Sequence, residues 1–316
     1  MGTHNRVISS GDGTYLEAIA IDPEAPGPEG ARWFGLDERQ GPAALHHWVV
    51  RSPDLTAVRP AVDLGEVTPM QRGDLTWRIA IPADGRLRLD GVAPSLISWD
   101  DMPPQLPASP LRFISLTVLH PDVERVRTLL ESLDFAGPVT VQADLGAGLI
   151  AAYETPSGPR FLASPGFGEP SLDRERQIAM DLFHATWRLL DLGERDADQS
   201  AAMVQCATAS LWHWRRVGAP TQWAIGEWQC SRVQAVLGDG SAALAHAQRA
   251  LDICETERVD DFVPASAHEA LARAYAVLGD MDAARHERNL AYRIAVDLDD
   301  DDRDVLEHDL GTLPIV

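Results

Sequence analysis

The second half of the chain repeats a short phrase that places two arginines at equivalent positions. Ala-Val-Leu-Gly-Asp occurs at residues 235–239 and again, 41 residues later, at 276–280. Counted back from the glycine of each copy, Arg232 and Arg273 occupy the same position. A guanidinium group binds a carboxylate through two parallel hydrogen bonds. Two arginines at the same repeated position therefore predict a site that takes a carboxylate or an acidic peptide.

Trp228 and Glu269 fall on the same groove-facing side as these arginines. Trp228 would supply apolar surface beside a bound carboxylate. Glu269 and Arg273 are four residues apart, a spacing that also forms a stabilising ion pair within one helix. Partner binding and internal pairing both explain the arginines, and the sequence leaves the two interpretations open.

His213, Glu227 and His246 are further polar candidates in this half. Such side chains on facing helices form metal sites and acid–base pairs in helical bundles. This half contains neither a His-x3-His nor a Glu-x2-His spacing, which would indicate a metal site on one helix face. The alternative is that the histidines pack beside the tryptophans of an aromatic core.

These side chains need helices to bring them together, and the sequence after residue 171 has helical character throughout. The glycine of each repeated phrase can end one helix. Alanines 5 and 12 residues further on allow the next helix to pack closely. We expect an all-α domain at 172–312, with helices at 172–191, 197–217, 221–237, 241–257, 265–278, 281–298 and 301–310.

This pattern resembles the tetratricopeptide repeat, a helix–turn–helix unit of about 34 residues. The segments 209–214 (Ala-Ser-Leu-Trp-His-Trp) and 226–233 (Gly-Glu-Trp-Gln-Cys-Ser-Arg-Val) are also similar to stand-alone bacterial tetratricopeptide-like proteins. The resemblance implies stacked helical hairpins whose first helices line a concave groove. Trp228, Arg232, Glu269 and Arg273 would then lie in this groove, which predicts that the domain binds a protein or an acidic peptide.

The first half alternates short apolar segments with turns, which predicts an α+β domain over residues 1–165. A strand–helix–strand–strand–strand pattern appears at 45–99, with a short helix expected at 54–62, and again at 112–163. A stretch rich in glycine and proline at 166–171 is expected to link the two domains.

Several phrases of this half carry a second resemblance. They are Gly-Thr-His-Asn-Arg at 2–6 with Tyr-Leu-Glu-Ala-Ile at 15–19, Arg-Trp-Phe-Gly-Leu at 32–36, Arg-Gly-Asp-Leu-Thr-Trp-Arg-Ile at 72–79, and Pro-Ser-Leu-Ile-Ser-Trp at 94–99. They resemble the glyoxalase-like branch of the vicinal-oxygen-chelate superfamily. The resemblance implies paired βαβββ modules around a divalent metal (Zn, Fe, Mn or Ni), which acts as a Lewis acid in lyases, isomerases and dioxygenases.

The chain departs from that family pattern in two places. It begins at Gly-Thr-His-Asn-Arg, so we expect the first module to be N-terminally incomplete and to lack the opening strand and helix. Ser98 stands where the pattern predicts an acidic ligand. The remaining candidate metal ligands are Glu17, His47 and His4. Each also has a structural interpretation, as an outward polar residue, a core histidine or a turn residue respectively.

The composition limits the classes of function. The chain has no lysine among its 27 basic residues, which excludes a Schiff-base lysine and a phosphate-loop lysine within it. Its net charge of −21 argues against a nucleic-acid partner. Without a long apolar run or a signal-peptide pattern, we expect no membrane association and a cytoplasmic location.

We therefore expect a small-molecule-binding or regulatory protein, with a degenerate glyoxalase-like domain and a partner-binding helical domain. The alternative is a divalent-metal enzyme of the vicinal-oxygen-chelate type. A third interpretation is a scaffold whose halves serve to form an oligomer such as a homodimer. No catalytic residue is identified by motif, since Gly-x-Ser-x-Gly, His-Glu-x-x-His and Gly-x-Gly-x-x-Gly are all missing from the sequence.

Overall fold

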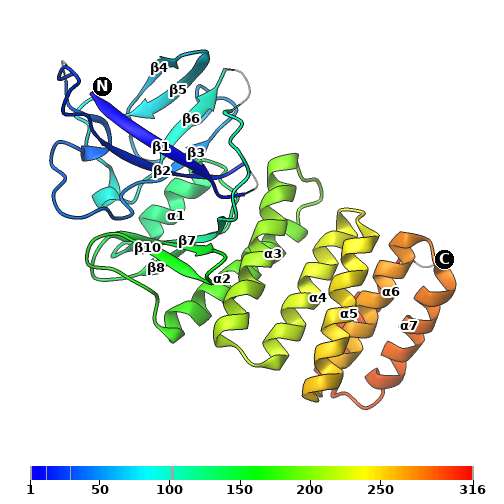
Figure 1. Ribbon diagram of the computed structural model, residues 1–316. Helices are drawn as coiled ribbons and strands as arrows, with labels where there is room; N and C mark the ends of the chain where they lie inside the picture. Colours follow the sequence, from blue (N-terminus) through cyan, green and yellow to red (C-terminus); the bar gives the residue numbers. More distant parts are fainter. Residues whose placement is uncertain (1, 12, 29, 101–102, 315–316) are drawn as a thin grey trace. The chain divides into compact units, whose positions relative to one another are not determined.

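The chain forms two compact units in a computed structural model. The first unit comprises Met1–Phe135 and Val139–Pro170, and the second comprises Ala136–Pro138 and Ser171–Val316. Each unit has its own hydrophobic core, built from a different kind of secondary structure (Figure 1). The residues that the structure describes are 2–11, 13–28, 30–100 and 103–314.

The first unit contains one two-stranded and two four-stranded sheets. β1 pairs with β2 in a hairpin, one larger sheet has the order β3-β6-β5-β4, and the other has the order β10-β9-β7-β8. The elements are β1 (Thr3–Ser9), β2 (Tyr15–Ile21), β3 (Val49–Arg51), β4 (Glu66–Arg72), β5 (Leu75–Ile81), β6 (Ser95–Trp99), β7 (Arg112–His120), α1 (Val123–Ser132), β8 (Val139–Ala143), β9 (Gly148–Glu154) and β10 (Arg160–Ala163).

The two four-stranded sheets differ in strand order, although their elements follow one another in a similar sequence. In the first sheet, the opening strand β3 is the parallel neighbour of the last strand, β6. In the second sheet, the opening strand β7 lies between β8, to which it is parallel, and β9. The expected repetition of one module is therefore confirmed for the succession of strands along the chain. The two sheets differ in which strands pair.

The short helix expected at 54–62 is wrong, because this segment forms turns. The Asp54 carboxylate accepts hydrogen bonds from the backbone amide (2.8 Å) and the hydroxyl (2.6 Å) of Thr56. An aspartate bonded in this way closes a local turn that competes with a helix. Pro60 lies within the segment and lacks the backbone amide that a helix interior requires.

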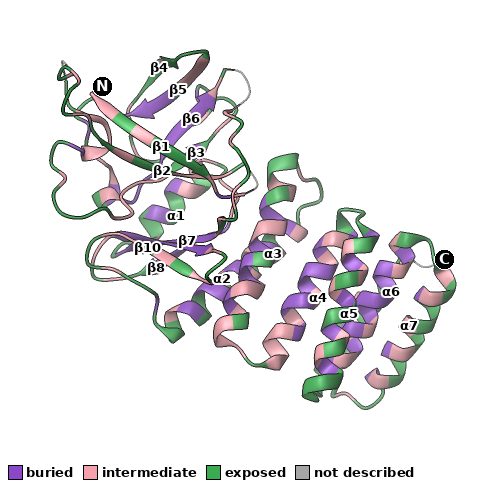
Figure 2. Cartoon of the chain, in the orientation of Figure 1, coloured by how far each residue is buried: buried purple, intermediate pink, exposed green. Residues whose placement is uncertain are grey.

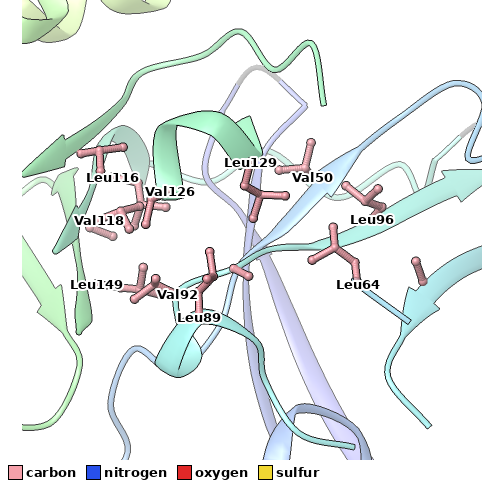
Figure 3. Close-up of a cluster of buried hydrophobic side chains, with 14 of the residues drawn as sticks. Val50, Leu64, Leu89, Val92, Leu96, Leu116, Val118, Val126, Leu129 and Leu149 are labelled. Atoms are coloured by element: carbon pink, nitrogen blue, oxygen red, sulfur yellow. The ribbon is translucent and has the colours of Figure 1, made fainter. Parts of the chain in front are cut away.

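One hydrophobic core joins the two four-stranded sheets and α1 within the first unit. Figure 3 shows Val50, Leu64 and Leu96 from the first sheet region facing the side chains of α1 and the second sheet. Val126 and Leu129 of α1 are almost completely buried there. The core therefore comes from both sheets and the helix together.

The second unit is helical throughout its described length, as the sequence predicts. Its helices are α2 (Leu172–Leu190), α3 (Ala197–Val217), α4 (Pro220–Val236), α5 (Gly240–Glu257), α6 (Val263–Leu278), α7 (Met281–Ala295) and α8 (Asp300–Gly311). The predicted helix boundaries agree within three residues. None of the described helices combines the length and the apolar character needed to cross a bilayer.

The repeated phrase forms the same turn in both copies. Gly238 and Gly279 adopt left-handed backbone conformations, with φ of 81° and 84°. The carboxylates of Asp239 and Asp280 then accept hydrogen bonds from backbone amides in the first turn of α5 (2.9 Å) and α7 (3.0 Å). Asp239 therefore caps α5.

Small residues let the helices pack closely around α6. Alanine occupies buried positions along most of α6, and Ala243 of α5 and Ala284 of α7 are completely buried. Figure 2 shows α6 largely buried, whereas α7 exposes one side. This arrangement places the polar side chains of α4 and α6 inside the helical unit.

Candidate functional site

A buried carboxylate on α6 gathers the four residues that the sequence assigns to a groove. The side chain of Glu269 is 1% exposed. Its Oε2 accepts a hydrogen bond from Nε1 of Trp228 (3.0 Å), and its Oε1 accepts hydrogen bonds from Arg232 (3.1 Å) and from Nε of Arg273 (2.8 Å). The internal ion pair between Glu269 and Arg273 weighed from the sequence is present. The sequence did not identify Glu269 as the shared acceptor of both arginines.

The same two arginines also hold the end of α8. Arg232 forms an ion pair with the Asp309 carboxylate at 2.8 Å. Arg273 donates to the backbone carbonyl of Asp309 (3.1 Å) and to the hydroxyl of Thr312 (2.8 Å). The Asp309 carbonyl also accepts hydrogen bonds from the backbone amide (3.1 Å) and the hydroxyl (2.7 Å) of Thr312, so Arg273 reinforces a helix end that is already capped. The arginines therefore already bind one acidic helical segment, supplied by the chain itself.

A cavity of about 140 Å³ lies between α4, α6 and α8, next to this cluster. The face that α8 turns toward it carries residues three and four positions apart, which is the spacing of one helix face. Its lining is mainly apolar, with two carboxylates and one hydroxyl. The lining residues are Ile225, Trp228, Phe262, Val263, Ser266, Asp302, Val305, Leu306 and Asp309.

Glu227 on α4 is the centre of a second polar cluster. Its Oε2 lies 2.7 Å from Nδ1 of His246 and 3.0 Å from Nε of Arg249, and its Oε1 accepts a hydrogen bond from Arg215 (3.0 Å). Burial alone would raise the pKa of Glu227, but the hydrogen bond with His246 and the charge of Arg249 lower it below its usual value. Glu227 is therefore a buried carboxylate held in its ionised form.

His213 belongs to a different buried pair. Its Nδ1 lies 3.1 Å from Oε1 of Glu175, and both side chains are 1% exposed. Burial lowers the pKa of His213, against the opposing hydrogen bond with Glu175. Arg216 also donates to Glu175. Of the three polar candidates, the structure thus brings Glu227 and His246 together and pairs His213 with a residue that the sequence did not single out.

A further acid–histidine pair went unnoticed in the sequence, although the repeat contains the signal. His268 and Glu287 lie 2.7 Å apart. They stand 41 residues after Glu227 and His246 respectively, so the acid and the base have exchanged positions. A comparison of all polar positions at this spacing would have found the pair.

In the first unit, the structure does not bring the three candidate metal ligands together. His4 on β1 and Glu17 on β2 are both exposed. Glu17 stands opposite Val7, three residues from His4, so His4 and Glu17 point to opposite faces of the hairpin. Asn5 donates a hydrogen bond to the Glu17 carboxylate.

His47 is partly buried and stacks on Phe34, with ring centroids 4.7 Å apart. Its Nε2 lies 2.9 Å from the hydroxyl of Ser95. Its Nδ1 is buried without a hydrogen-bond partner among the described atoms. Burial lowers the pKa of His47 to about 3, so the ring is neutral.

The described residues do not fit a divalent metal site of the kind that the family resemblance implies. Nowhere within the described ranges do three or more His, Cys, Asp or Glu side chains lie close enough to share a metal ion. The hydroxyl of Ser98, where the family pattern predicts an acid, donates to the Pro53 carbonyl at 3.3 Å. The geometry therefore supports no reaction step through a metal.

The sheet-rich unit can now be compared with known families. Residues 1–133 match the family model of a glyoxalase-like domain. The match includes β1 to β7 and α1 and stops before β8, so it supports the resemblance expected for 1–165 as far as residue 133. The helical unit lies outside the match. No curated protein matches the chain.

Proposed function

We propose that the protein is a binding or regulatory protein whose tetratricopeptide-like helical unit captures a protein partner through an acidic helix. The observation that carries this proposal is the double contact of Arg232 and Arg273 with Glu269 and with the end of α8. Two arginines held in place by a buried carboxylate can bind the acidic group of α8, or that of a partner that replaces α8, without moving themselves.

α8 has the properties of an occupant that a partner could replace. It is strongly acidic, with Asp300, Asp301 and Asp302 in its first turn. It buries only Leu306 and Leu310, and the cavity of about 140 Å³ remains beneath it. A helix with little buried apolar surface gains little stabilisation from docking. A partner helix with a carboxylate at the position of Asp309 and better-matched apolar residues would therefore compete with α8.

The glyoxalase-like domain is proposed as a small-molecule-binding element. The alternative, a metal-dependent enzyme, rests on the family resemblance, and no arrangement of the described side chains favours it. The helical unit therefore provides the more specific test of function.

Peptide capture by a chain with loosened α8 tests the proposal. In the Leu306→Asp/Leu310→Asp double variant, α8 loses its two buried side chains while Arg232 and Arg273 are unchanged. A fluorescent peptide with the sequence of residues 299–313 should bind this variant, and its fluorescence anisotropy should fall as salt concentration rises. The unmodified chain should capture the peptide more weakly, because its own α8 competes.

A peptide with asparagine in place of aspartate at position 309 is the matched control. The ion pair with Arg232 is then lost, so capture should fall by about tenfold, the equivalent of 1.4 kcal/mol. Equal binding of the two peptides, or no binding of either to the double variant, would refute the proposed role of the arginines.

A further inference from the structure

The cavity beneath α8 is lined by carboxylates and apolar side chains that play no part in the proposed binding of an acidic helix. One face of α8 lines it with Asp302, Val305, Leu306 and Asp309, in the order carboxylate, apolar, apolar, carboxylate. The spacing of three, one and three residues keeps all four on one side of the helix. The opposite wall is formed by side chains of α4 and α6.

Two aromatic rings line this cavity. Trp228 contributes an indole that is held from behind by Trp187, with ring centroids 5.8 Å apart, and by the hydrogen bond from its Nε1 to Glu269. Phe262 contributes the second ring. The faces of aromatic rings carry partial negative charge and attract cations, most strongly in the case of tryptophan. The lining therefore combines apolar contact with preference for positive charge.

The two carboxylates of the cavity differ in their surroundings. Asp309 is neutralised by its ion pair with Arg232. The carboxyl group of Asp302 forms a hydrogen bond with that of Asp261. Within the described part of the chain, no arginine or histidine forms an ion pair with Asp302. Burial raises the pKa of Asp302, and the charges of Asp299, Asp261 and Asp301 raise it further. A bound cation would remove this repulsion.

The size of the cavity limits the ligand. A cavity of about 150 Å³ accommodates one benzene molecule, and the volume here is about 140 Å³. The net charge of −21 also attracts small cations to the protein from a distance.

We propose that this cavity binds a small organic cation, an ammonium group attached to an apolar body of about the size of a benzene ring. The ammonium group lies against Asp302, and the apolar body packs between Trp228, Phe262 and Val305. The site requires α8 in its docked position, because Asp302 and Val305 belong to that helix. A partner that replaced α8 would therefore remove one wall of the cavity.

Benzylammonium is the probe, in a ligand-observed NMR titration of the full chain. Benzyl alcohol has the same ring without the charge, and methylammonium has the charge without the ring. Benzylammonium should bind saturably with a dissociation constant of about 1 mM or tighter. Both comparison compounds should bind at least about tenfold more weakly, because each lacks one of the two contributions.

Two pairs of variants locate the site. Asp302→Asn should weaken benzylammonium binding about five- to tenfold. Asp301→Asn removes the same charge from the same helical turn, but outside the cavity lining, and should weaken binding much less. Val305→Trp should fill the cavity and abolish binding. Val296→Trp, at a similarly exposed position outside the cavity, should leave binding intact (Val296 and Val305 are 72% and 66% exposed).

Equal affinity for benzyl alcohol and benzylammonium would overturn the proposal, as would equal losses in the Asp301 and Asp302 variants. No saturable binding of benzylammonium to the full chain would also overturn it. None of these outcomes bears on peptide capture by Arg232 and Arg273, which is measured separately.

Discussion

The hairpins α4–α5 and α6–α7 share one backbone plan but distribute their charges differently. Both turn at a left-handed glycine followed by an aspartate cap, and both join their helices through one acid–histidine pair at 2.7 Å. In α4–α5, the acid is on the first helix (Glu227) and the histidine on the second (His246). In α6–α7, His268 is on the first helix and Glu287 on the second. Both hairpins thus have the contact, with the acid and the histidine on opposite helices.

The surroundings of the two pairs differ more than the pairs themselves. Glu227 has two arginines in addition to His246, whereas the position equivalent to Arg249 in the second repeat is Leu290. The first pair is therefore part of a charged network. For His268 and Glu287, no further ion pair is found among the residues that the structure describes. The two repeats therefore share their helix packing but differ in the charged residues that surround the acid–histidine pair.

The largest loss of stability is expected from a substitution of Glu269, which contacts residues of both repeats. Its counterpart in the first repeat is Trp228, which donates a hydrogen bond to it. Glu269→Ala leaves Arg232 and Arg273 without their buried acceptor and should lower the free energy of unfolding of the helical unit by about 3–5 kcal/mol. Trp228→Phe removes one hydrogen bond and should cost about 1 kcal/mol. Urea unfolding followed by circular dichroism measures both, and similar losses would contradict this assignment.

A smaller loss of stability should distinguish the two acid–histidine pairs. Glu227→Gln weakens three contacts of a side chain that is 5% exposed, and should cost about 2–3 kcal/mol, because charged hydrogen bonds with half-exposed arginines are worth less than fully buried ones. Glu287→Gln weakens one contact of a side chain that is 17% exposed, and should cost at most about 1 kcal/mol. If the two variants are equally stable in urea, the arginines around Glu227 contribute nothing measurable.

The glycine turns should respond equally, which would confirm the shared backbone plan. A Cβ atom on Gly238 or Gly279 meets no other atom within 4 Å, so only the left-handed conformation opposes an alanine. Gly238→Ala and Gly279→Ala should each cost about 1 kcal/mol. Thermal unfolding of the two variants gives the comparison. A clear difference between them would show that the turns are under different strain.

The smallest expected effect is a change in how the stability of the helical unit depends on pH when Glu227 is replaced. The folded protein holds the pKa of Glu227 below its unfolded value of 4.5, since His246 and Arg249 outweigh the opposing effect of burial. The stability contributed by this ionised group is complete above about pH 4.5 and is lost as pH falls through the lowered pKa. Glu227→Gln should therefore flatten the acid side of the stability–pH curve. Parallel curves for the variant and the unmodified chain would count against this pKa shift.

The helices were predictable because their signals are local. The alanine spacing and the helix-ending glycines Gly238 and Gly279 act within a few residues, and the structure confirms them. The strand pairings were not predictable, because they depend on contacts between segments distant in sequence. The strand order around β7 is an example. The helix wrongly expected at 54–62 is a different case, because the turn at Asp54 is a local structure that competes with a helix.

The candidate site was predicted in part. The 41-residue repeat gave the residues of the Glu269 cluster. It could not show that α8 supplies Asp309 and Thr312 to the same arginines, because α8 lies outside the repeated phrase. Similarly, Glu175 and His213 are on neighbouring helices that lack the repeat, so no spacing connects them.

The pairing of β3 with β6 has a consequence for the order in which the chain folds. β3 pairs only with β6 within the described sheet, and β4 and β5 are synthesised between them. A strand in this position cannot form its backbone hydrogen bonds until the meander from β4 to β6 is complete, and pairings between distant segments form slowly. The helical unit, in contrast, adds one hairpin at a time from neighbouring segments. In a refolding experiment, the sheet-rich unit should therefore be the later of the two to acquire its native structure, and its exposed strand edges make it the more vulnerable to aggregation in the meantime.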